Sequence, residues 1–167
     1  MSEFSQMVEL RSVDLRVRHL VADEGERAAL AERFGLVSIG LLEADIELIA
    51  DGAVVDATGT LRAEIVQSCA ITGDDLPASI REKLVFRFVP EAEEPAEIDQ
   101  EIDSSEIDEL PYLGTSFDLG EAIAESLALA IDPYACGPNA DAVRKEAGLL
   151  GEDDTGPFAV LKGLVKE

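Results

Sequence analysis

Two cysteines and one histidine carry the most specific side-chain chemistry in this sequence. Cys69 follows a predicted strand, and Cys136 lies much further along, beyond a helix that a proline ends. A structural zinc ion needs about four nitrogen or sulfur ligands. Cys69, Cys136 and His19 fall short of that number unless carboxylates complete the set. The sequence therefore favours two reduced thiols, one of them buried. A zinc- or thiol-dependent binding module that uses both cysteines is an alternative.

Enzymatic chemistry has little support in the residues. His19 is the lone histidine and has no identifiable partner, so a catalytic role is disfavoured. The sequence has no phosphate-binding glycine loop, no nucleophile elbow and no HExxH motif. Glu121 and Glu125 lie one helical turn apart and could hold magnesium, as in a metal-dependent nuclease. Such a pair more often caps or solubilises a helix, so we predict a protein that is no enzyme and needs no cofactor.

Charge is the strongest signal in the composition. The 167 residues include 36 acidic and 13 basic side chains, a formal net charge of -23. The resulting field repels phosphate and argues against a generic nucleic-acid-binding protein. The segment 91–110 concentrates acidic residues, so we predict a mobile acidic loop that could attract a basic protein. Its candidate partner-binding carboxylates are Glu93, Glu94, Glu97 and Glu101.

A local basic stripe runs against this overall charge. Arg81, Lys83 and Arg87 alternate along a predicted strand and therefore share its outward face. Such residues often pair with carboxylates for little net stabilisation, but a patch of this kind could also contact RNA. No run of apolar residues is long enough to span a membrane, and residues 1–10 do not form a signal-peptide pattern. We therefore expect a cytoplasmic protein with no membrane partner.

The elements that must position these residues are strands followed by helices. Short apolar-polar alternations predict one or two strands over 5–18. Strands are also predicted over 36–50, with a bulge at Leu41–Leu42 where the apolar parity switches, and over 54–67. A third run places Ile80, Leu84, Phe86 and Phe88 on the inward face. These three runs suggest an antiparallel meander.

Two helices have clear start signals. Asp23 and Glu26 have the spacing of a capping box, and Gly35 suits the helix end. Asp118 and Glu121 begin a second helix that runs to Ile131 and is apolar nearly all round, so we expect it to be buried. A weaker helix is predicted over 139–150.

The predicted fold is therefore α+β. A curved antiparallel sheet, either an open meander or barrel-like, packs against the buried helix in a single domain over 1–167. Residues 151–156 form a linker to a short amphipathic C-terminal helix over 157–165, where Phe158 and Leu161 are candidate partner contacts. Exposed sheet edges leave homo-oligomer formation open.

Four pieces of the sequence together resemble one family. They are Glu26–Leu36, the strand leading into Gln67-Ser68-Cys69, Phe117–Tyr134, and Pro157–Leu161. In this order they are similar to the bacterial YceD family, described as large ribosomal RNA subunit accumulation proteins. Many relatives carry Cys-x-x-Cys at the second piece, whereas here Thr72 takes the place of the second cysteine.

The resemblance implies a ribosome-biogenesis factor that promotes accumulation or maturation of 23S rRNA and the large subunit. We expect it to act by binding rather than by chemistry. A basic ribosomal protein is the preferred partner, and a large-subunit pre-rRNA intermediate contacted through Arg81, Lys83 and Arg87 is the second. The acidic character of the chain agrees with the first partner, since ribosomal proteins are strongly basic.

Overall fold

The computed structural model describes residues 3–91 and 108–148. Contacts divide the chain into two compact units. The larger unit combines Met1–Gln67 with Pro77–Asp132, and the smaller one combines Ser68–Leu76 with Pro133–Glu167. The sequence-predicted sites at Glu93, Glu94, Glu97, Glu101, Phe158 and Leu161 lie outside the described residues.

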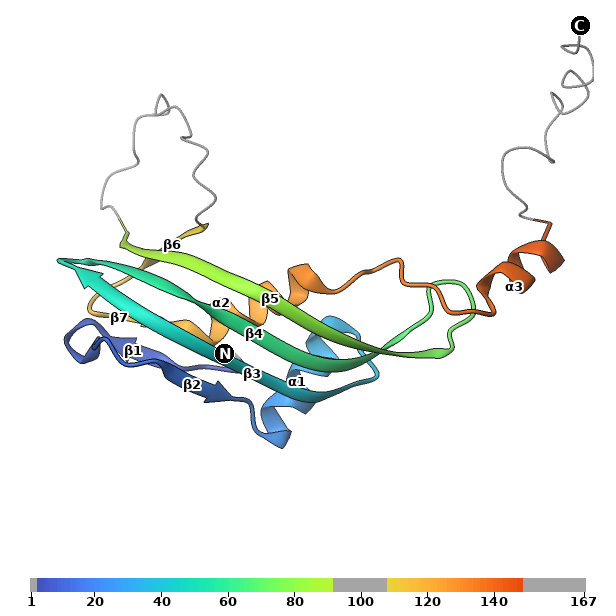
Figure 1. The fold of residues 1–167 in the computed structure, drawn as a ribbon, viewed down its shortest axis with the longest axis horizontal. Coiled ribbons are helices and arrows are strands. Elements are labelled where there is room, and N and C mark those ends of the chain that lie inside the picture. Colours follow the sequence, from blue (N-terminus) through green and yellow to red (C-terminus); the bar gives the residue numbers. More distant parts are fainter. Residues whose placement is uncertain (1–2, 92–107, 149–167) are drawn as a thin grey trace, which may run out of the picture. The chain divides into compact units, whose positions relative to one another are not determined.

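A five-stranded sheet dominates the described fold (Figure 1). Its strands, in spatial order, are β2 (Arg18–Val21), β3 (Ser38–Asp51), β4 (Val54–Ser68), β5 (Asp75–Pro90) and β6 (Asp108–Tyr112). The pairings β2–β3 and β3–β4 are antiparallel. The α+β class is confirmed, but the sheet formed by the described strands is open, with β2 and β6 as its edges.

The prediction of a purely antiparallel sheet is wrong at β6, which runs parallel to β5. Parallel neighbours need a connection of roughly a dozen residues or more, and the chain between β5 and β6 is long enough to provide one. The structure also places Asp108, Glu109 and Leu110 in this strand, although the sequence assigned them to the acidic loop.

A second, two-stranded sheet pairs distant parts of the chain. β1 (Met7–Glu9) lies antiparallel to β7 (Ser116–Asp118). A short 3-10 helix, η1 (Leu10–Ser12), follows β1. The prediction of one or two strands over 5–18 therefore holds for β1 and for Arg18, where β2 begins, but not between them, where Leu15 and Val17 are 76% and 63% exposed.

The helix α1 (Glu24–Phe34) begins and ends as the sequence predicts. The Asp23 carboxylate accepts the Glu26 N–H at 2.9 Å, and the Glu26 carboxylate accepts the Asp23 N–H at 2.7 Å. This reciprocal pair satisfies two amides that a helix start leaves unpaired. Gly35 ends the helix in the left-handed region, at φ 65°.

The helix α2 (Leu119–Ala130) is also confirmed, and its start holds the N-terminal part of the chain. Oδ1 of the Asp118 carboxylate accepts the N–H groups of Gly120 and Glu121. The same oxygen accepts the Gln6 N–H at 2.8 Å, and Ser5 donates its hydroxyl to the other oxygen at 2.7 Å. In the smaller unit, α3 (Ala140–Glu146) lies within the predicted weaker helix.

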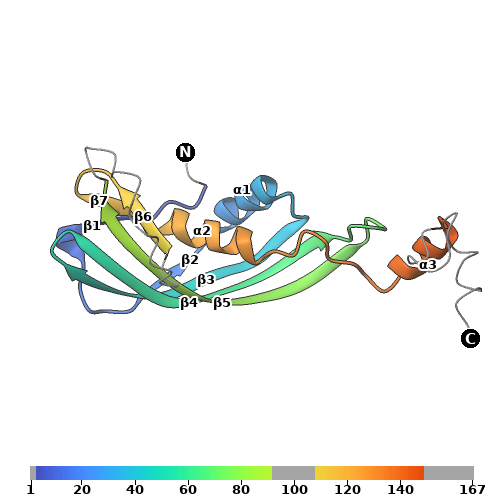
Figure 2. The ribbon, with the colours of Figure 1, turned by 90° about the horizontal axis from the view of Figure 1, so that it is seen from above.

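The core lies between the sheet and the helices α1 and α2, which cover the same face of the sheet (Figure 2). The clean alternation in β4 is confirmed, because its inward side chains are Val55, Ala57, Leu61, Ala63 and Ile65. In β3 the register shifts between Ile39 and Leu41, so the bulge lies one position before the predicted one. Ile39 and Leu42 are both buried. In a regular strand, residues three positions apart point to opposite faces of the sheet, so the bulge is what lets both side chains face the core.

Aromatic rings close the core beside β6 and β7. Phe88 and Phe117 are stacked with their ring centroids 4.1 Å apart, and Tyr112 is tilted against Phe117 at 6.1 Å. The Tyr112 hydroxyl donates to the carbonyl of Ala53. Within the part of the chain that the structure describes, no helix is long and apolar enough to cross a membrane.

Candidate functional site

The outward face of the sheet carries the predicted basic stripe among carboxylates. Arg81 and Lys83 are exposed on β5 and form no ion pair with any described residue. Arg87 differs, because its Nε lies 2.7 Å from Oδ1 of Asp56, and this carboxylate raises the pKa of Arg87. The three residues share a face, as predicted, but only two of them are available to bind an anion.

Neighbouring strands add further acidic groups to this face. Arg62 Nη2 lies 3.1 Å from Oε1 of Glu43. His19 is exposed, and its Nδ1 lies 2.7 Å from Oδ1 of Asp45. The sequence alone did not identify this partner. The face is therefore mixed in charge, and its ion pairs are of the exposed kind that contributes little to stability.

A groove runs along α2 beside β5 and β6. It consists of three hollows of about 300, 270 and 240 Å³, each of which shares lining residues with the next. We call it the α2–β6 groove. Its apolar side chains include Phe86, Phe88, Leu110, Phe117 and Leu129. Its acidic side chains, apart from the helix cap Asp118, are Glu82, Asp108, Glu109, Glu121 and Glu125.

The groove has few cations to balance these carboxylates. Lys83 lines only the hollow at one end. Glu82, Asp108 and Glu125 form no ion pair within the described residues. Glu109 contributes to the field that raises the pKa of Arg87. The groove thus combines an apolar floor with an acidic rim, a combination suited to a cationic partner with apolar side chains.

Glu121, one of the carboxylates that line the groove, forms an ion pair with an arginine. Arg33 on α1 binds Glu121 with Nη2 2.7 Å from Oε1, and binds Glu3 with Nη1 2.9 Å from Oε2. These two carboxylates raise the pKa of Arg33. The magnesium site suggested for Glu121 and Glu125 would have to displace this guanidinium. Nowhere among residues 3–91 and 108–148 do three His, Cys, Asp or Glu side chains gather as a metal site.

The smaller unit contains both cysteines, and both are free thiols. Cys69 is buried at the start of a tight turn, in which the Gly73 N–H donates to the Cys69 carbonyl at 2.9 Å. Its Sγ accepts the N–H of Gly137 at 3.3 Å and the N–H of Thr72 at 3.4 Å. The amide of Gly137 and the side chain of Thr72 are the main causes that lower the pKa of Cys69 to about 6.

Cys136 is exposed and close to a cation. Its thiol donates to the Tyr134 carbonyl at 3.2 Å, and Arg144 Nη2 lies 3.6 Å from its Sγ. The prediction that one of the two thiols is buried is confirmed, since Cys69 is buried and Cys136 is exposed. Both N–H groups that contact Cys69 Sγ are hydrogen-bond donors, and such donors favour the thiolate form over the thiol.

We expect the Cys69 thiol to be half ionised near pH 6, well below the value of about 8.5 for a free cysteine. Thiolate absorbance in a Cys136→Ser protein measures this titration. Thr72→Val should raise the pKa because it removes a hydroxyl donor, whereas Thr72→Ser should leave it nearly unchanged.

The same titration predicts a pH dependence of stability. The folded-state pKa lies below the unfolded one, so thiolate formation stabilises the fold above about pH 8.5 and this contribution is lost as the pH falls through about 6. A Cys69→Ser protein should lack this component of the pH profile. An ordinary thiol pKa in the Cys136→Ser protein would contradict the assignment.

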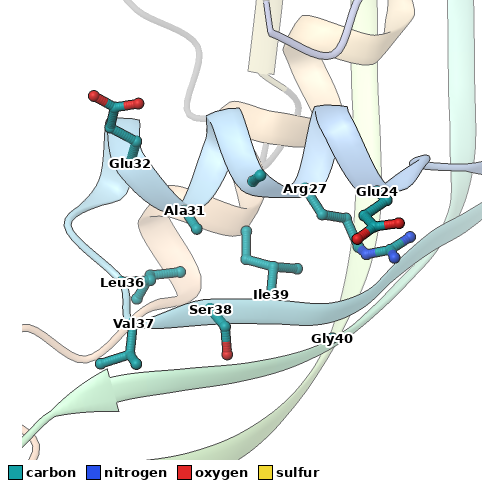
Figure 3. Close-up of a pocket in the computed structure, with 10 residues that line it drawn as sticks. Glu24, Arg27, Ala31, Glu32, Leu36, Val37, Ser38, Ile39 and Gly40 are labelled. Carbon is teal, nitrogen blue, oxygen red and sulfur yellow. The ribbon is translucent and has the colours of Figure 1, made fainter.

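A further hollow, of about 490 Å³, lies between α1 and the start of β3 (Figure 3). Arg27, Ala31 and Glu32 line it from the helix, and Ser38 and Gly40 line it from the strand. Arg27 donates from Nη1 to the Ala22 carbonyl at 2.6 Å, which fixes its guanidinium. Among the described residues that line this hollow, the titratable side chains are Glu24, Arg27 and Glu32, with the Ser38 hydroxyl as the remaining polar group.

Reasoning from the sequence missed the α2–β6 groove. The only signal for it in the sequence was Leu129, an apolar residue four positions after Glu125 and therefore on the same side of the predicted helix. Asp108 and Glu109 belonged to a predicted loop, so nothing placed them beside a helix. The groove exists because β6 returns to the sheet next to α2.

Comparison with known proteins gives one match. A family model described as Large ribosomal RNA subunit accumulation protein YceD matches residues 57–165. No curated protein and no solved structure matches the chain. The matched range contains the groove, the basic stripe and both cysteines.

Proposed function

Because the chain belongs to the YceD family of large ribosomal RNA subunit accumulation proteins, we propose that it serves this accumulation by binding a basic ribosomal protein. In this proposal it acts in the cytoplasm, as a chaperone-like binding factor, and makes or breaks no covalent bond. The family supplies the process, and the acidic α2–β6 groove supplies the reason to choose a basic protein as the partner.

Charge complementarity is the observation that carries the proposal. The net charge of -23 creates a long-range field that attracts cationic proteins and repels RNA. In the groove, Glu82, Asp108 and Glu125 have no ion-pair partner among the described residues. Carboxylates without a counter-ion provide a place where a cationic partner replaces solvent ions.

Direct contact with pre-rRNA is the second candidate, and one observation favours it. Arg81 and Lys83 are exposed on the outward face of β5 and lack a carboxylate partner in the described part of the chain. Against it, Asp56 holds Arg87, and Glu43 and Asp45 lie on neighbouring strands of the same face. Two free cations supply few phosphate contacts.

Binding assays with purified components test the two candidates against each other. The full chain is titrated with individual basic proteins of the large subunit, and separately with a large-subunit rRNA fragment, over a salt series. We expect at least one basic protein to bind, with an affinity that falls as salt rises. The double variant Arg81→Glu/Lys83→Glu should leave this affinity unchanged or slightly higher.

Two results would overturn the proposal. One is tight binding of the rRNA fragment that the double variant abolishes, with no affinity for any basic protein. The other is an unchanged ratio of large- to small-subunit rRNA in cells that lack this chain. The first would establish the RNA candidate, and the second would remove the role in accumulation.

A further inference from the structure

We infer that the α2–β6 groove is the docking site for an extended segment of the basic partner, which places an apolar side chain beside Leu129 and cationic side chains along the acidic rim. This inference rests on the proposed function and specifies where and how the partner binds. Three features of the groove support it: an exposed apolar side chain, carboxylates on both walls, and a strand edge.

The apolar feature is Leu129. This side chain is 85% exposed, although it belongs to a helix whose other leucines, Leu119 and Leu127, are fully buried. It lines the hollow of about 270 Å³ together with Phe86 and Leu110. An exposed leucine beside an apolar floor provides a contact for one apolar side chain of a partner.

The electrostatic feature is the placement of carboxylates on opposite walls. Glu125 stands on α2, and Asp108 and Glu109 stand on β6, and all three line the same hollow as Leu129. At one end, Arg33 is engaged with Glu121 and Glu3. An apolar side chain in this hollow would therefore be flanked by negative charge on both sides, which selects segments with lysine or arginine next to an apolar residue.

The backbone feature is the edge of β6. This strand pairs with β5 on one side, and no described strand lies on its other side. Unpaired strand edges accept extended segments as an additional strand. Pro111 carries no N–H, which confines regular pairing to the stretch before it, Asp108 to Leu110. That stretch is also the one that lines the hollow beside Leu129.

RNA does not fit this groove. Its rim would place carboxylates against phosphates, and among the described residues that line the groove Lys83, at one end, is the single cation. A protein segment with alternating basic and apolar residues satisfies the floor, the rim and the strand edge together.

The experiment measures the affinity of the full chain for a short synthetic peptide of alternating lysine and leucine. Glu125→Lys and Leu129→Ser alter the groove at exposed positions, so neither should unfold the protein. Glu47→Lys, on the exposed face of β3, matches the first change in charge, and Leu15→Ser, at another exposed leucine, matches the second. Thermal unfolding of each variant verifies that the fold is retained.

We expect each groove variant to weaken peptide binding by about tenfold, which corresponds to about 1.4 kcal/mol, and each control to change it by less than about twofold. Hydrogen exchange should show protection of the amides of β6 in the complex. Equal losses for Glu125→Lys and Glu47→Lys would show that the peptide senses only net charge, and would overturn the inference. An unchanged affinity for Leu129→Ser would remove the apolar contact and overturn it as well.

The same variants separate the groove from the proposed function. If a basic large-subunit protein binds the chain with equal affinity in all four variants, the proposed function stands and the groove is not its site. If no such protein binds, the proposed function fails, whatever the peptide does.

Discussion

Gly59→Ala should destabilise the protein by about 3 kcal/mol, because overpacking of well-packed sites typically costs about 1–3 kcal/mol and here the obstacle is backbone. A Cβ at this position would lie 2.1 Å from the Asp45 carbonyl oxygen and 2.9 Å from the Cα of Ile46. Both atoms belong to β3, which pairs with β4 at this point of the sheet. The obstacle cannot rotate away as a flexible side chain would, so the two central strands have to separate.

Urea denaturation measures this loss, with Thr60→Ala as the control. Thr60 is the exposed neighbour in β4 and points away from the core, so its truncation should change stability by less than about 0.5 kcal/mol. A Gly59→Ala protein with the midpoint of the parent would show that β3 and β4 are further apart at this position than the structure places them.

Phe117→Ala should destabilise the fold by about 3–5 kcal/mol, the usual cost of truncating a buried aromatic residue to alanine. Phe117 is 2% exposed and stacks on Phe88 with 4.1 Å between ring centroids. Tyr112 packs against the same ring from β6. The truncation therefore leaves a cavity where β5, β6 and β7 meet.

Phe117→Leu is the matched control, since it retains much of the buried volume and should lose clearly less stability. The ring also lines the α2–β6 groove, so Phe117→Ala should weaken lysine–leucine peptide binding even under conditions where the protein stays folded. A loss of stability no larger than that of Phe117→Leu would contradict the packing described for this ring.

Local features of the fold were predictable from the sequence. The helix starts at Asp23 and Asp118 depend on contacts within three residues, and the alternation in β4 depends on burial of one face. The bulge in β3 was placed one position late because Leu41 and Leu42 both look apolar, whereas only Leu42 is fully buried. The direction of β6 depends on pairing across a long connection, which local patterns do not encode.

The candidate site was predictable only in its chemistry. Sequence reasoning found the outward face of Arg81, Lys83 and Arg87 and the buried thiol, since these follow from strand parity and residue type. It could not find that Asp56 of the preceding strand neutralises Arg87, or that the Gly137 amide donates to Cys69 from 68 positions away. These contacts arise only when distant segments fold together.

The pairing of β1 with β7 has a consequence for synthesis of the chain. Met7 lies opposite Asp118, and Phe4 is buried at 1% exposure. A polypeptide emerges from the translating ribosome in the amino-to-carboxyl direction, so β1 must wait for more than a hundred later residues before its partner strand β7 exists. β1 is therefore made long before it can take its place in the fold, and the nascent chain carries Phe4 uncovered while the residues between β1 and β7 are synthesised.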